Sequence, residues 1–76
     1  MNKNSFYVIE IIENETGKTA ARAETVPNNY NLLGYFKPAR GFSVLSVNAC
    51  STLKKAQEIA IFWNEEAKAK NRFLYA

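Results

Sequence analysis

The sequence S-T-L-K-K-A-Q-E-I-A-I-F-W-N-E-E-A-K-A-K-N, residues 51–71, decides the fold predicted for this chain. Its apolar residues recur at steps of three and four, which places them along one stripe of an α-helix. They are Leu53, Ala56, Ala60, Trp63 and Ala67. The hydroxyl of Ser51 or Thr52 suits the helix N-cap, and Asn71 tolerates the left-handed backbone that often ends a helix. The stretch therefore predicts one long amphipathic helix that packs on a small sheet.

Three segments before this helix are rich in β-branched and aromatic residues, which favour strands. They are residues 5–13, 18–26 and 42–49. The first two are joined by a turn that ends at Gly17, whose positive φ can close a tight hairpin loop. We expect residues 28–34 to form one short helical turn, and the apolar tail at residues 72–76 to dock on the domain. The predicted fold is α+β, a three-stranded antiparallel sheet (β-β-β-α) packed against one long C-terminal helix.

The hairpin loop decides which face of the first strand meets the helix, because a shift of one residue exchanges the two faces. We predict a three-residue loop that pairs Asn14 with Lys18, since this register places Glu10 opposite Arg22. One face of the hairpin is then almost entirely apolar, and we assign it to the helix. It carries Tyr7, Ile9, Ile11, Ala21 and Ala23.

In this register the opposite face of the first strand is more apolar than a solvated sheet face should be. The helix has a similar surplus, because its apolar arc is too wide for one sheet face to cover. Together these surplus side chains are Phe6, Val8, Ile12, Phe62 and Phe73. They predict an interface with a protein partner, most simply a second copy of the chain.

The length and composition of the chain limit the classes of function that it can have. Its 76 residues predict a single domain, residues 1–76, with a thin core. The absence of a signal peptide, of a membrane-spanning segment and of a second cysteine predicts a cytoplasmic protein. The chain has no histidine and no aspartate, so it lacks the usual base near neutral pH and the imidazole metal ligand. We therefore expect no enzyme activity, no metal and no cofactor, and we interpret Cys50 as a small buried hydrophobe.

The net charge of +3 arises in the middle of the chain, where no acid occurs between Thr25 and Gln57. The cations there are Lys37, Arg40, Lys54 and Lys55, and Tyr35 is among the aromatic residues beside the first two. This composition suits a surface on which nucleic acid bases stack, and the two lysines in the first helical turn suit an anion site. Two structural interpretations remain open: the aromatic residues pack into the core, and the lysines are solvated.

The segment Thr52-Leu53-Lys54-Lys55-Ala56, followed by Trp63 and preceded by a glycine-turn hairpin, resembles a known domain type. It is similar to the three-stranded-sheet-plus-helix domains at the N-termini of phage and transposon integrases, which bind arm-type DNA sites. The resemblance implies DNA reading by polar and basic side chains on the sheet face away from the helix. In the predicted register that face carries Phe6, Val8 and Ile12 instead, which counts against this mode. The chain also resembles small uncharacterised proteins of mobile elements in Gram-positive bacteria.

These patterns predict a non-catalytic protein-interaction module that self-associates as a homodimer, encoded by a phage or conjugative element. One alternative is a nucleic-acid-binding accessory protein that uses the basic residues of the middle segment. A second alternative is a small inhibitor that binds a host enzyme.

Overall fold

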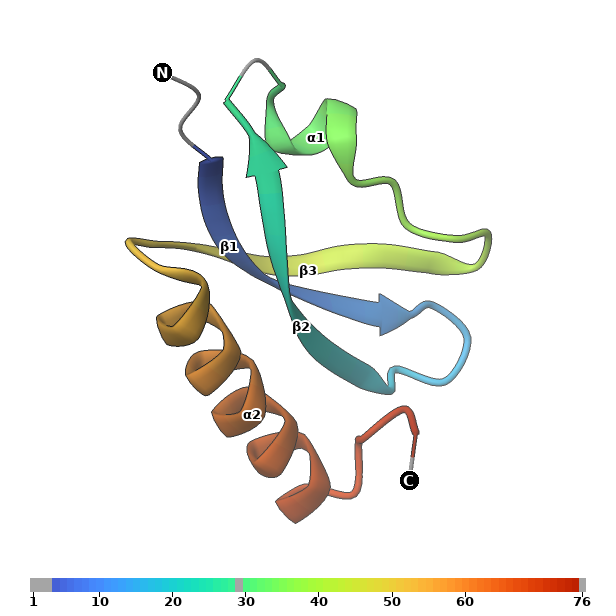
Figure 1. Cartoon of the computed structure of the whole chain (residues 1–76). Helices are drawn as coiled ribbons and strands as arrows, with labels where there is room; N and C mark the ends of the chain where they lie inside the picture. The colour runs from blue at the N-terminus through green and yellow to red at the C-terminus, as the bar shows by residue number, and fades with distance from the viewer. Residues whose placement is uncertain (1–3, 29, 76) are drawn as a thin grey trace.

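The chain folds into a three-stranded antiparallel sheet with one long helix on one face (Figure 1). The computed structural model describes residues 4–28 and 30–75. In chain order the elements are β1 (Asn4–Glu13), β2 (Thr19–Pro27), α1 (Leu32–Tyr35), β3 (Phe42–Cys50) and α2 (Leu53–Ala69). The strand order in the sheet is β2-β1-β3, so the first strand lies in the middle. The predicted α+β fold and its β-β-β-α order are confirmed, and the short helical turn expected at residues 28–34 lies at Leu32–Tyr35.

Helix α2 begins and ends as its sequence predicts. The Thr52 hydroxyl accepts a hydrogen bond from the Lys55 backbone N–H at 3.1 Å, and Asn71 adopts a left-handed φ of 56°. Ala56 and Ala60 pack against Val8 and Ala21 to form the buried core. Small residues at these contacts let the helix approach the sheet closely. Larger side chains surround this cluster: Phe6, Ile59 and Trp63.

The predicted hairpin register is wrong by one residue. The Glu13 N–H donates to the Lys18 carbonyl at 2.8 Å, and the Gly17 N–H donates to the Glu13 carbonyl at 2.8 Å. The loop therefore contains four residues instead of three, and Ile9 lies opposite Arg22. Gly17 has the expected positive φ of 75°. This one-residue difference exchanges the two faces of β1 relative to β2.

Val8 consequently lies under α2 with 0% of its surface exposed, whereas the prediction placed it on the face away from the helix. Ala21 and Ala23 face the helix as predicted. The prediction that Tyr7, Ile9 and Ile11 also meet the helix is wrong, because neighbouring residues of a strand alternate between its faces.

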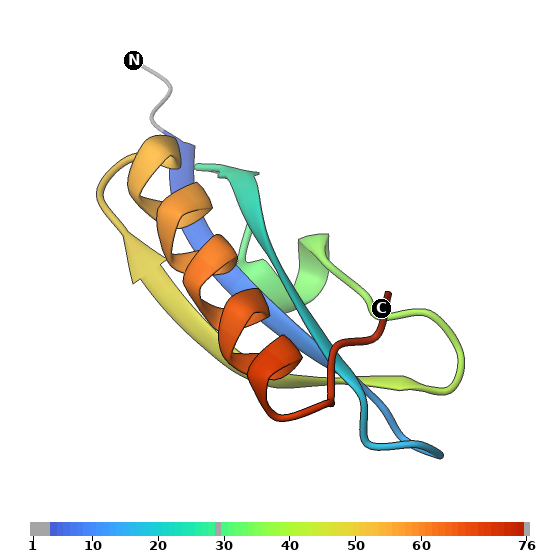
Figure 2. The same cartoon turned by 90° about the horizontal axis from the view of Figure 1, so that it is seen from below.

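The second face of the sheet is covered by the chain itself, which explains why β1 is apolar on both sides. Figure 2 shows α2 on one face and the segment that contains α1 on the other. Phe36 from this segment and Tyr75 from the tail line a small cavity of about 70 Å³ with Ile9 and Ile11. The Arg22 guanidinium lies 5.0 Å from the centre of the Phe36 ring. The sequence prediction assigned the cover of the second hairpin face to a protein partner, whereas Phe36 and Tyr75 of the same chain lie on it.

The tail docks as predicted, along the free edge of β2. The Thr19 N–H donates to the Arg72 carbonyl at 2.8 Å, and the Leu74 N–H donates to the Thr19 carbonyl at 2.8 Å. Phe73 thereby forms an isolated parallel bridge with Thr19. Within the described residues, no helix is both long enough and apolar enough to cross a membrane.

Candidate interaction surface

Helix α2 covers β2 and β1 but barely touches β3 (Figure 1). Four of the nine residues of the third strand are therefore exposed, and two of its large apolar residues are among them. Leu45 is 51% exposed and Val47 is 42% exposed. Leu45 lies on the helix side of the sheet and Val47, opposite Ile9, lies on the other side, so each face of β3 has an exposed apolar side chain that a partner can cover.

β3 also has an open hydrogen-bonding edge, since β1 is its only neighbour in the sheet. In an antiparallel sheet, a residue of the middle strand bonds to one neighbour and the next residue bonds to the other. Glu13 bonds to β2, so Val8 and Glu10 bond to β3, where their partners are Asn48 and Ser46. The backbone groups of Val47, between these two partners, therefore point away from the sheet. The same alternation points those of Ala49 outward.

The free edge of β2, unlike that of β3, is partly covered by other parts of the chain. The Asn64 side chain of α2 accepts a hydrogen bond from the Ala21 N–H at 2.7 Å and donates one to the Ala21 carbonyl at 2.9 Å. The tail bonds to both backbone groups of Thr19 in the same way. At its other end β2 finishes at Pro27, which has no N–H to offer. Among the described residues, the outward backbone groups of Ala23 and Thr25 are left without such cover.

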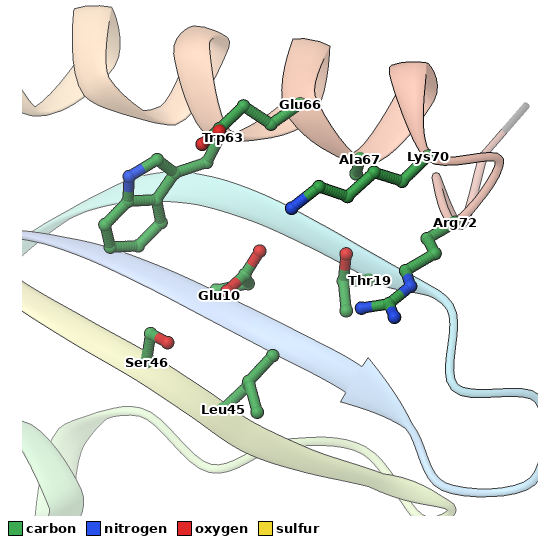
Figure 3. Close-up of a pocket in the computed structure, with 9 residues that line it drawn as sticks. All are labelled: Glu10, Thr19, Leu45, Ser46, Trp63, Glu66, Ala67, Lys70 and Arg72. Carbon is green, nitrogen blue, oxygen red and sulfur yellow. The ribbon is translucent and has the colours of Figure 1, made fainter.

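A groove of about 220 Å³ lies between the last turns of α2 and β3 (Figure 3). Its apolar side chains are Leu45, Trp63 and Ala67, and its charged side chains are Glu10, Glu66, Lys70 and Arg72. In Figure 3 Lys70 extends from the helix toward the sheet, and Glu10 extends from β1 toward the helix. Two acids and two bases give the groove no net charge. It therefore has no electrostatic preference for an anion such as phosphate.

The structure separates the five residues of the predicted partner interface. Val8 is in the core, and Phe6 packs beside it, because the register turns both toward α2. Ile12 is half-buried. Phe73 lies beyond the end of the helix on the β2 side, where the Lys68 amino group is 5.0 Å from its ring centre. Its predicted place on the apolar arc of the helix is wrong, because α2 ends at Ala69, before Phe73.

Phe62 alone matches the predicted exposure, with 61% of its surface accessible. At 100° per residue, its position on α2 lies on the same flank as Glu66, which lines the groove. Phe62 therefore belongs to the flank of α2 that faces β3.

The predicted basic residues do not form one cluster. Lys37 and Arg40 precede β3, whereas Lys54 and Lys55 follow it, and all four are exposed. The nine residues of β3 span about 26 Å at ~3.3 Å per residue. Both views show the two segments at opposite ends of this strand (Figures 1 and 2). Tyr35 is 46% exposed and packs edge to face against Tyr30, with 5.6 Å between the ring centres.

Three residues of this surface were missed by the sequence analysis: Leu45, Val47 and Asn64. The sequence contains one signal for Leu45 and Val47. Residues 42–50 include no charged residue and no proline, which usually prevent an exposed edge strand from pairing with another chain. Asn64 gave no such signal, since its bonds to Ala21 join residues 43 positions apart.

Within residues 4–28 and 30–75, no three or more histidine, cysteine, aspartate or glutamate side chains come together in a way that could hold a metal ion. Cys50 is half-buried at the end of β3 and packs against the core. Comparisons of the chain with protein-family models, with curated proteins and with solved structures found no match.

Proposed function

We propose that this chain is a non-catalytic protein-interaction module that self-associates through apolar surface on its sheet and helix. The observation that carries the proposal is the incomplete cover of the sheet by α2. The helix covers two of three strands. The third exposes Leu45 on the helix side of the sheet, where Phe62 is also exposed, and Val47 on the opposite side. Burial of such side chains stabilises an association by about 25 cal/mol per Å² of apolar surface.

The arrangement of charge favours a protein partner over nucleic acid. The four basic residues of the middle segment lie at the two ends of β3, and the groove between α2 and β3 contains as many acids as bases. A nucleic-acid surface normally concentrates cations along the path of the backbone. An inhibitor of a host enzyme would use the same apolar surface against a different partner. An origin in a phage or conjugative element stays a prediction from the sequence resemblance.

Self-association is tested by sedimentation velocity and light scattering over a concentration series from 1 to 200 μM. We expect the average mass to rise from about one to about two chains within this range. A Leu45→Lys variant should shift the transition to higher concentration, because the substitution adds a charge at an exposed position outside the core. An unmodified protein that remains monomeric throughout the series would overturn the proposal.

A further inference from the structure

We infer that two copies of this chain join edge to edge through β3, in antiparallel orientation, to form one continuous six-stranded sheet. The strand order would be β2-β1-β3 followed by β3-β1-β2 of the second copy. This inference rests on the proposed self-association and specifies its contact.

The edge of β3 is suited to pairing with another strand. From Ser46 to Cys50, β3 pairs with β1 without interruption. The register shifts only before Ser46, between the partners of Glu10 and Ile11. The strand contains neither a charged residue nor a proline. Edge strands that stay unpaired usually carry a charge, a proline, a bulge or a cover. The irregularity leaves Leu45 as an extra residue of β3, so the regular part of the edge runs from Ser46 to Cys50. The outward backbone groups of Val47 and Ala49 are therefore available to a second strand.

The closed edge of β2 determines the symmetry of the pairing. Pairing of β3 with β2 of another copy would repeat indefinitely and produce a filament. Asn64 and the tail occupy the edge of β2 at Ala21 and Thr19, which blocks this arrangement. Within the described part of the chain, the edge of β2 therefore stays open only at Ala23 and Thr25, and the longer open edge is that of β3. An open edge that pairs with itself gives a closed dimer.

The sequence of β3 is complementary to itself around Val47. With the two-fold axis at this residue, Val47 of one copy lies opposite Val47 of the other, on the sheet face away from α2. Ser46 of one copy then lies opposite Asn48 of the other, on the helix face. An apolar pair on one face and a polar pair on the other match the preferences of cross-strand neighbours.

This self-complementarity identifies the occupant as a second copy. A charged peptide would gain no ion pair from β3, since the strand has no charge to recognise it. Two copies of the strand, by contrast, meet without like-charge repulsion and offer each other the same open edge.

Two variants of Val47, one with a positive and one with a negative side chain, test the inference. Val47→Lys and Val47→Glu should each raise the dissociation constant of the homodimer about tenfold or more, because like charges then meet across the axis. An equimolar mixture of the two variants should regain dimers, now as heterodimers that native mass spectrometry resolves by mass. A Val47→Pro variant, which removes the outward N–H, should also weaken the dimer about tenfold.

The control is the same pair of substitutions at Ile61, which is 62% exposed on α2. Ile61→Lys and Ile61→Glu should leave the dissociation constant within about threefold of the unmodified value. Circular dichroism should show that all variants remain folded. If the unmodified protein dimerises but the Val47 variants dimerise equally well, the edge-pairing inference is overturned while the proposed function stands. If Phe62→Glu abolishes the dimer and Val47→Pro does not, the contact is the helix flank, which also overturns the inference.

Discussion

Asn64 on α2 bonds to both backbone groups of Ala21 on β2, at 2.7 Å and 2.9 Å, and so takes the place of a neighbouring strand. A side-chain amide has one acceptor and one donor group, the same pair that a peptide unit presents. The helix is therefore attached to the edge of the sheet as well as to its face. The tail adds a second attachment one step along the same edge, at Thr19.

Replacement of Asn64 by alanine should lower the free energy of unfolding by about 1–3 kcal/mol, because it leaves the half-buried groups of Ala21 without partners. Urea unfolding followed by circular dichroism measures this change. Glu65→Ala, at the neighbouring exposed position, should change the stability by less than about 0.5 kcal/mol. Equal effects of the two substitutions would contradict a special role for Asn64.

Truncation after Asn71 should open the edge of β2, because it removes both hydrogen bonds between the tail and Thr19. Exposed strand edges recruit further strands. We therefore expect the truncated protein to form species larger than a dimer, with masses that increase with concentration in sedimentation velocity. A truncated protein with the same mass distribution as the full chain would show that the tail does not guard this edge.

Val8→Ala should destabilise the fold by about 2 kcal/mol, since it removes two methyl groups from a fully buried site beneath α2. Val8→Lys should prevent folding altogether, because the site offers no partner for a buried charge. Thermal unfolding of these variants compares them with Ile61→Ala, an exposed change expected to cost less than about 0.5 kcal/mol. A folded and stable Val8→Lys protein would contradict the register that places Val8 inside.

The separation of the basic residues predicts weak binding to nucleic acid. Fluorescence anisotropy with labelled single-stranded and double-stranded DNA should show no binding at 150 mM NaCl and micromolar protein. Strong binding with a steep salt dependence would contradict this expectation. In that case, Lys37→Ala and Lys54→Ala would show which end of β3 contacts phosphate, since removal of one phosphate contact lowers the salt slope by about one.

Local sequence determined the elements of this fold. The steps of three and four between Leu53 and Ala67 determined the helix, and Thr52 and Asn71 determined its ends. Each of these signals acts within a few residues, through capping bonds and backbone preferences that the surrounding fold does not alter. The hairpin, the third strand and the docked tail were predictable for the same reason.

Only the tertiary structure decided which side of β1 lies inside. Its residues are apolar on both faces, so the alternation that normally sets the register was missing, and a loop of three or four residues decided the outcome. The segment that carries Phe36 covers the second face, and it comes from a part of the chain whose position no local pattern indicates. The same holds for the two sheet edges. Asn64 covers the edge of β2 although it is 43 positions away from Ala21 in the sequence. The edge of β3 remains open because α2 packs mainly on β2 and β1.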